Sequence, residues 1–359
     1  MATWCKKCLL TDRVEDTIID ENRLCDYCAG RRKDEWESRF GVTELRKQQL
    51  RTELERAMDD GRGKYDYDCV LALSGGKDSS YLLYHLLEER QLRVLAVHVN
   101  TPFESNVAEQ NMKVLREKLD FDLEIVDPGE GFYMEFYRTL FSNPVREGYI
   151  KTICYVCGPF FTGCCLKVAA QRNIPLVFLG VSPNQPDNMF FEWGKDVVQE
   201  RDWIPELFKS HKFSDEFRCK FWNPLEYPEG TAIPRLIAPL HVMEYNAEKI
   251  MEELSANGIL RKKDMNPMVT NCALNWPMVY LDTKLLGHNP YIKEFSSKVR
   301  RGESSRAFWK SLLWLAEGEI KLGIFRRRTI RAIEKALDMR FSDCPTDRDA
   351  IARSFEAYP

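Results

Sequence analysis

Residues 74–79, with the sequence Ser-Gly-Gly-Lys-Asp-Ser, constrain the fold of this 359-residue chain more strongly than any other stretch. They follow an apolar run at 69–73 and lead into a second apolar segment at 80–87. Strand, glycine turn and helix is the order that a phosphate-binding loop requires. Glycines let backbone N–H groups approach an oxyanion, and the helix N-terminus adds a partial positive charge. Lys77 supplies a cation and the serines supply hydroxyl donors; an ordinary turn with a solvated lysine is the alternative.

Short apolar runs alternate with amphipathic segments after the loop begins. We expect strands at 69–73, 93–100, 123–127, 175–180 and 234–240, and helices at 79–90, 105–118, 160–172 and 247–254. This alternation predicts an α/β fold with a doubly wound parallel sheet. Ligands of such sheets bind beyond the carboxyl ends of the strands, so His98, Asn100 and Gly180 should lie near the loop. A packed edge residue is the alternative for His98.

The N-terminal segment holds two Cys-x-x-Cys pairs, Cys5/Cys8 and Cys25/Cys28, separated by sixteen residues. This is the spacing of a zinc ribbon, in which four thiolates close a tetrahedral, structural Zn²⁺ site. The segment has too little apolar material for a core of its own, so it would need the metal in order to fold. Another metal, or two reactive dithiols, are the alternatives.

Bulk composition excludes several classes of function. The net charge of −3 and the pI near 6.1 argue against wholesale wrapping of nucleic acid, although not against a local basic patch. Four arginines within 326–331 could line a solvated helix face or bind phosphate, and we favour the solvated face. No run approaches the length of a membrane-spanning helix, and the N-terminus lacks the apolar core of a signal peptide. We therefore expect a cytoplasmic protein with no membrane partner.

The loop lacks the Gly-Lys-Ser/Thr ending of a Walker A site and resembles the PP-loop of the N-type ATP pyrophosphatases. These HUP-like proteins cleave ATP between the α and β phosphates and adenylate a substrate. The resemblance implies that Lys77 stabilises charge on the α–β bridge and that Asp78 binds Mg²⁺. The residues that would hold ATP are Ser74, Gly75, Gly76, Lys77, Asp78, Ser79, His98, Asn100 and Gly180.

A third pair, Cys154 and Cys157, lies between the expected third and fourth strands. With Cys272 it resembles the three-cysteine set of PP-loop sulfurtransferases, which holds a [4Fe–4S] cluster with one open iron. A second zinc, a reactive dithiol and packed, reduced cysteines are alternatives. Cys164 or Cys165, on the expected helix at 160–172, could replace Cys272 as a ligand. The stretch 180–186 departs from the Gly-His-Asn-x-Asp-Asp pattern of tRNA-modifying relatives, which argues against a standard tRNA thiolase.

The ribbon, the loop and the segment 291–306 together resemble the N-acetyl sugar amidotransferases of surface-polysaccharide and nonulosonic-acid biosynthesis. Members adenylate the acetamido oxygen of a nucleotide-linked sugar, and ammonia from a glutaminase partner then displaces AMP. The segments implied are a zinc ribbon at 1–40, a helical linker at 41–66, a PP-loop domain at 67–245 and a helical region at 246–359 that completes the active site. The irregular stretch 184–230 would shape the acceptor pocket.

The main rival function shares the adenylation step but then delivers sulfur to tRNA or to a small molecule. In that case Cys154 and Cys157 would be catalytic and tRNA would become a partner. A reductase of the same fold fits poorly with the two N-terminal cysteine pairs. A non-enzymatic ATP-binding regulator conflicts with the intact Lys77–Asp78 pair. A homodimer is compatible with the sequence.

Overall fold

The computed structural model describes residues 2–32, 44–182, 217, 220–223, 226–228, 231–265 and 271–356. The chain divides into two compact units. The ribbon unit comprises Met1–Gly41, Met134–Tyr155 and Leu274–Pro359, and the sheet unit comprises Val42–Tyr133 and Val156–Ala273. The four segments expected from the sequence stay a prediction. The stretch 184–230 lies largely outside the described residues.

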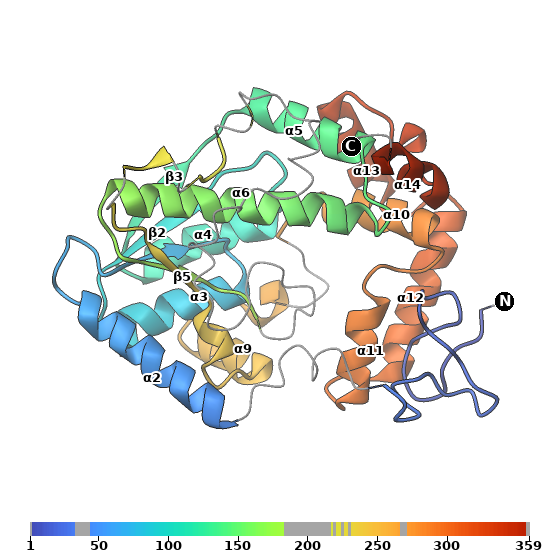
Figure 1. Ribbon diagram of the computed structural model, residues 1–359, viewed down its shortest axis with the longest axis horizontal. Helices are drawn as coiled ribbons and strands as arrows, with labels where there is room; N and C mark the ends of the chain where they lie inside the picture. The colour runs from blue at the N-terminus through green and yellow to red at the C-terminus, as the bar shows by residue number, and fades with distance from the viewer. Residues whose placement is uncertain are drawn as a thin grey trace. The chain divides into compact units, whose positions relative to one another are not determined.

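The sheet unit is built on five parallel strands in the order β3-β2-β1-β4-β5 (Figure 1). Their bounds are β1 (Cys69–Ala72), β2 (Val94–Val99), β3 (Asp122–Val126), β4 (Leu176–Leu179) and β5 (Arg235–Ile237). The chain proceeds from β1 outward to β3 on one side and then returns to place β4 on the other side of β1. The carboxyl ends of β1 and β4 therefore form the switch point at which such sheets bind ligands.

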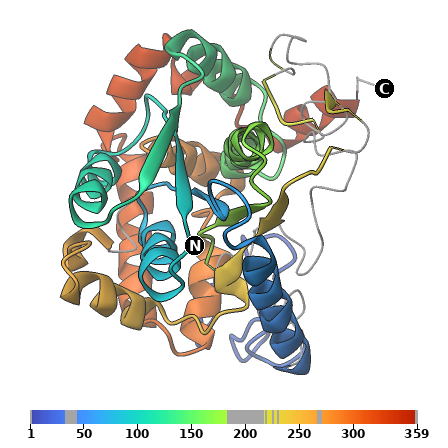
Figure 2. The same cartoon turned by 90° about the vertical axis from the view of Figure 1, so that its left-hand side faces the viewer.

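Helices cover both faces of this sheet, which confirms the predicted α/β fold (Figure 2). Alternate residues of a strand point to opposite faces. Leu71 accordingly packs on the face covered by the four helices α2, α3, α4 and α9, whose bounds follow, while Val70 packs on the face covered by α6 (Tyr149–Gln171). The bounds in this unit are α2 (Glu44–Gly61), α3 (Lys77–Tyr84), η1 (His85–Glu89), α4 (Asn106–Lys118), η4 (Pro239–His241), α9 (Ala247–Ala256) and η5 (Lys262–Met265).

The described part of the ribbon unit is helical apart from its N-terminal segment. Its helices are α10 (Asn275–Leu286), α11 (Ile292–Arg300), α12 (Arg306–Lys321), α13 (Arg327–Leu337), η6 (Phe341–Asp343) and α14 (Arg348–Glu356). Two further helices, α5 (Glu130–Ser142) and α6 (Tyr149–Gln171), run from one unit into the other. The C-terminal region is thus helical, as predicted.

Helix α6 begins eleven residues earlier than the sequence indicates, so the predicted start at residue 160 is wrong. Its first backbone N–H groups, of Tyr149 and Ile150, donate to the two carboxylate oxygens of Asp282 at 2.5 and 3.0 Å. Gly148 makes this approach possible, because a Cβ atom there would lie 2.5 Å from the Asp282 Oδ1 atom. A carboxylate at a helix N-terminus satisfies donors that otherwise have no partner. The cap lies 133 positions away in sequence, where local patterns cannot reveal it.

Within the described ranges α6 is the one helix long and apolar enough to cross a membrane by length and composition. The expectation that no run reaches that length is therefore corrected. Pro159 lies inside the helix. Since 61% of its most apolar window is buried within the molecule, packing accounts for the composition of α6.

Replacing Asp282 by Asn should flatten the pH dependence of stability. Asp282 is 1% exposed, and burial raises the pKa of its carboxyl to about 7, although the hydrogen bonds from Tyr149 and Ile150 oppose the shift. In the unfolded chain an aspartate carboxyl has a pKa of about 4, so the folded state keeps its proton up to a higher pH. The protonated carboxyl of Asp282 therefore adds up to about 4 kcal/mol to the free energy of unfolding. This contribution is full below about pH 4 and is lost as the pH rises through about 7. Asparagine keeps an acceptor oxygen but cannot ionise.

The measurement is the free energy of unfolding by urea across this pH range. Asp349→Asn, at an exposed position in the first turn of α14, is the matched control and should parallel the wild type. Parallel curves for wild type and Asp282→Asn would contradict the prediction.

Candidate functional site

The loop at residues 74–79 lies at the carboxyl end of β1, beside β4, and is closed by its own serines. The hydroxyl oxygens of Ser74 and Ser79 lie 3.1 Å apart. Ser74 Oγ accepts from the Gly76 N–H at 3.4 Å, and Ser79 Oγ donates to the Gly76 carbonyl at 3.2 Å. Gly76 is the N-cap of α3, and its cap makes no side-chain hydrogen bond. The first N–H groups of α3 are therefore a ready site for an anion.

Three glycines allow neighbouring groups to approach the backbone of this loop closely: two of them meet other backbone, and Gly76 meets a side chain. Gly75 has φ +69°, and a Cβ atom on it would lie 2.7 Å from a backbone carbonyl oxygen of α4. A Cβ on Gly76 would lie 2.5 Å from the side-chain nitrogen Nδ2 of Asn271, and one on Gly180 would lie 2.4 Å from the Cα of Ser79. Gly180, which follows β4, is thus packed on the start of α3. The glycines nominated from the sequence share one small region of the sheet unit.

Lys77 and Asp78 are joined to each other and to Tyr245, in the segment between η4 and α9. Lys77 Nζ donates to Asp78 Oδ1 at 2.5 Å and to the Tyr245 hydroxyl at 2.7 Å. The Tyr245 hydroxyl donates to the same Asp78 oxygen at 2.9 Å. Sequence reasoning missed Tyr245. The observation that could have nominated Tyr245 is its place in the segment after β5, because ligands of parallel sheets bind beyond the carboxyl ends of the strands.

His98 and Asn100, which the resemblance nominates as ATP-binding residues, both have protein partners. His98 is buried; its Nδ1 lies 2.9 Å from the Leu73 carbonyl and its Nε2 lies 3.2 Å from the Glu104 carboxylate. Burial lowers the pKa of His98, but the hydrogen bonds to Glu104 and to Leu73 outweigh it and raise the pKa overall. Asn100 is exposed, and its side-chain amide donates to Asp127 at 3.1 Å. His98 therefore joins the end of β1 to the segment that carries Glu104.

Cys272 lies beside the loop, in a short antiparallel pairing with Glu104. The pairing is extended by a hydrogen bond from the Ser105 N–H to the Asn271 carbonyl at 2.9 Å. The Asn271 side-chain nitrogen lies 3.4 Å from Ser74 Oγ. Cys272 is half-buried in this arrangement. Its proximity to the loop is a consequence of tertiary structure, because about 200 residues separate it from Ser74.

Cys154 and Cys157 lie on α6, three positions apart and hence on the same side of the helix. Cys154 is exposed and Cys157 is half-buried. Within the described ranges, the one group of three or more metal-ligating side chains whose ligand atoms all lie within 4.8 Å of one another is at the N-terminus. The iron–sulfur site of Cys154, Cys157 and Cys272 stays a prediction.

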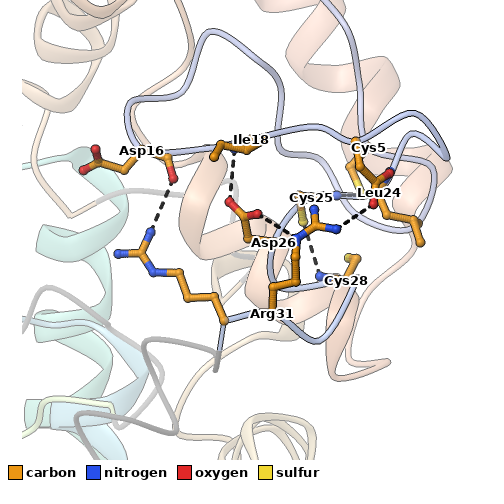
Figure 3. Close-up of polar contacts among 10 residues, drawn as sticks. Cys5, Asp16, Ile18, Leu24, Cys25, Asp26, Cys28 and Arg31 are labelled. Atoms are coloured by element: carbon orange, nitrogen blue, oxygen red, sulfur yellow. Dashed lines mark hydrogen bonds and ion pairs between the residues drawn. The ribbon is translucent and has the colours of Figure 1, made fainter.

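That N-terminal group is the predicted set of Cys5, Cys8, Cys25 and Cys28. Figure 3 shows Cys5, Cys25 and Cys28 of this group. The sulfur atoms of Cys8 and Cys25 lie 3.6 Å apart. Tetrahedral zinc with Zn–S bonds of about 2.3 Å places its sulfurs about 3.8 Å apart. The Cys25 N–H also donates to the Cys5 sulfur at 3.4 Å, a contact that suits a thiolate as the acceptor. The four cysteines could therefore hold a metal ion.

Electrostatics within the cysteine group indicate why it needs a cation. Hydrogen bonds with Cys25 and Cys28 lower the pKa of Cys8 to about 2, whereas hydrogen bonds with Cys25 and Cys8 raise the pKa of Cys28. One thiolate is thus stabilised by its neighbours at the expense of a second, and four thiolates together require a positive ion. Arg306, at the start of α12, donates to the carbonyls of Cys8 at 2.9 Å and Cys5 at 2.6 Å.

Comparisons with known proteins identify no family. No protein-family model matches the chain. An uncharacterized protein of Methanocaldococcus jannaschii is 23% identical over 206 residues, which are 57% of this chain and 57% of that protein. The chain thus spans little more than half the length of this relative.

Three solved structures show weak similarity. The U34-tRNA thiolase NcsA from Methanococcus maripaludis, with its [4Fe–4S] cluster, has a TM-score of 0.34 and 16% identity, covering 84% of this chain and 87% of that one. The NH3-dependent NAD synthetase from Campylobacter jejuni subsp. jejuni has a TM-score of 0.36 and 14% identity, with coverages of 73% and 95%. The NMN synthetase from Francisella tularensis has a TM-score of 0.36 and 12% identity, with coverages of 74% and 93%. These values are too low to assign a family or an activity, so the α/β assignment rests on the topology of the chain itself.

Cys25→Ser should remove a bound metal ion and destabilise the ribbon unit. The protein should be purified with about one metal ion per chain at this site, which we expect to be zinc, because the sulfur set and spacing suit that ion. Metal analysis by mass spectrometry, with thermal unfolding before and after chelation, measures both effects. Cys344→Ser is the control, since Cys344 is a buried cysteine of the same unit outside the group. Equal metal content in Cys25→Ser and wild type would refute the assignment.

Proposed function

We propose that this protein is an ATP-dependent adenylating transferase, which converts ATP to AMP and pyrophosphate. The observation that carries the proposal is the pairing of Lys77 with Asp78, 2.5 Å apart, on the first turn of α3 above a glycine loop. This places a cation and a carboxylate at a helix N-terminus whose cap is backbone alone. The position, outside the carboxyl ends of β1 and β4, is where α/β sheets bind nucleotides.

The residues of the loop have distinct roles in the proposed reaction. The acceptor oxygen attacks the α-phosphorus, a new P–O bond forms, and the bond from the α-phosphorus to the bridging oxygen breaks to release pyrophosphate. Backbone N–H groups of the loop and the hydroxyls of Ser74 and Ser79 would hold the phosphates. The Lys77 ammonium would stabilise the negative charge that develops on the leaving pyrophosphate. Asp78 would hold Mg²⁺, which screens the triphosphate.

For the acceptor we favour the acetamido group of a nucleotide-linked N-acetyl sugar, acting in the cytoplasm. The support is the combination of a four-cysteine group at the N-terminus, the loop and a helical C-terminal region, in the order of the amidotransferases that the sequence resembles. Ammonia from a glutaminase partner would attack the adenylated carbon, AMP would leave, and the amide oxygen would depart with AMP. The product is an acetamidino group.

Sulfur transfer is the second candidate, and the position of Cys272 favours it. This half-buried cysteine lies next to the loop through the contact of Asn271 with Ser74. A thiolate there, with Cys154 and Cys157, would suit a [4Fe–4S] cluster with one open iron. The acceptor would then be tRNA or a small molecule.

Asp78→Asn should reduce acceptor-dependent pyrophosphate release by about 100-fold or more, the effect of removing one group that acts on transition-state charge. The assay combines ATP, Mg²⁺, ammonium and a panel of nucleotide-linked N-acetyl sugars, with AMP and pyrophosphate both measured. Asp120→Asn, at an exposed position after α4, should keep wild-type activity. Unchanged release in Asp78→Asn would remove Asp78 from the mechanism. Release of ADP and phosphate by the wild type would overturn the proposed reaction.

Anaerobic purification separates nitrogen transfer from sulfur transfer. If sulfur is transferred, we expect about four iron atoms per chain and a broad absorbance at about 400 nm, typical of thiolate-ligated clusters. Cys272→Ser should lose this iron, whereas Cys344→Ser should keep it. Stoichiometric zinc without iron would favour amidation.

A further inference from the structure

The hydroxyl of Tyr245 holds the two charged side chains of the loop together. It accepts a hydrogen bond from Lys77 Nζ at 2.7 Å and donates one to Asp78 Oδ1 at 2.9 Å. Lys77 itself donates to that same oxygen at 2.5 Å, so the three groups form a closed triangle. The ammonium also lies 5.3 Å from the centre of the Tyr245 ring. Both charged side chains are about one-fifth exposed, so the triangle is only partly open to water.

In this arrangement the charges of Lys77 and Asp78 neutralise each other. The reaction proposed above requires Lys77 to interact with phosphate and Asp78 with Mg²⁺. The ion pair must therefore open before the nucleotide is held correctly. A carboxylate that loses its cationic partner needs another donor, and a phenol hydroxyl is suited to this because it can both accept and donate.

We propose that Tyr245 is a positioning residue for the Lys77–Asp78 pair. In the free protein its hydroxyl accepts from Lys77 and restrains the amine beside Asp78. When Lys77 turns to the phosphates, the hydroxyl continues to donate to Asp78 and keeps the carboxylate oriented for Mg²⁺. The orientation of Asp78 for Mg²⁺, which is the second stage, rests on the proposed function. The restraint of Lys77 in the free protein, which is the first stage, does not depend on that function.

The backbone around Tyr245 is anchored well enough for such a role. The preceding residues are tied to η4 by hydrogen bonds from the N–H groups of Val242 and Met243 to the Pro239 carbonyl, at 3.0 and 2.9 Å. Arg51 on α2 donates to the Val242 carbonyl at 2.5 Å. The next residue, Asn246, caps α9 with two hydrogen bonds of 3.0 Å. A side chain held by its neighbours on both sides can orient a partner with little loss of entropy.

The first test measures the reactivity of the Lys77 amine in the full-length protein without nucleotide. Acetylation by an amine-reactive ester is followed by peptide mass spectrometry, with the exposed Lys249 on α9 as internal reference. Tyr245→Phe keeps the ring but removes the hydroxyl, and should raise the Lys77 rate about fivefold, the factor equivalent to one hydrogen bond. Asp78→Asn should raise it too. Tyr84→Phe, a partly buried tyrosine of α3 packed on the same core, should match the wild type.

The second test measures binding of ATP at increasing Mg²⁺ concentration. Tyr245→Phe should require about tenfold more Mg²⁺ for half-maximal binding, the usual effect of losing a group that orients a metal ligand. Its affinity for ATP without Mg²⁺ should stay within about twofold of wild type, because its loop backbone is unchanged. A loss of fold would weaken both affinities together, so this split separates positioning from a structural role.

The outcomes distinguish the inference from the proposed function. Wild-type labelling of Lys77 in Tyr245→Phe would overturn the role of Tyr245, whatever the protein does with ATP. Faster labelling with an unchanged Mg²⁺ requirement would limit the role to the free protein and overturn the second stage. Faster labelling in a protein that neither binds ATP nor releases pyrophosphate would leave the restraint standing and refute the proposed function.

Discussion

The close approach of backbone segments around residues 74–79 is the constraint on which the rest of the site depends. A Cβ atom at Gly75 or Gly180 would overlap neighbouring backbone at 2.7 or 2.4 Å, and one at Gly76 would meet the side-chain amide of Asn271 at 2.5 Å. Each close contact joins the loop to a different part of the sheet unit: α4, the segment at 271–273 and the end of β4. The loop is therefore shaped from several sides, and its N–H groups are held in place before any anion arrives. Such preorganisation lowers the cost of binding a charged ligand, because little reorganisation remains.

The same packing concentrates charge in a small volume. Lys77 and Asp78 are adjacent in sequence, and the N-terminal turn of α3 brings their side chains to one side, where Tyr245 meets both. Opposite charges that neutralise each other can remain partly buried without a bound ligand. The cysteine group at the N-terminus also concentrates charge, but it contains no cationic side chain among its four members. Its thiolates are alike in charge, so neighbours stabilise one at the expense of another, and a metal ion is the natural counter-charge.

Sequence reasoning succeeded where the signal was local. The alternation of apolar runs predicted the parallel sheet, and the five expected strands overlap β1 to β5 because each is short, apolar and bounded by turn residues. It failed at the start of α6, because the true N-terminal cap, Asp282, comes from another helix. It also missed Tyr245 and Asn271. Both contact the loop from far along the chain, and neither residue belongs to a motif.

The sequence by itself determined the order of strand, glycine loop and helix, and the four N-terminal cysteines that lie together in the fold. Spacing suffices for these features because glycine freedom, helix capping and thiolate chemistry act within a few residues. Only the tertiary structure decided what surrounds the loop. Parallel strand order brings β4 and the segments carrying Tyr245 and Cys272 to the carboxyl end of β1, through crossover connections of many residues. The partners of Lys77 and Asp78 follow from that strand order, which local spacing does not specify.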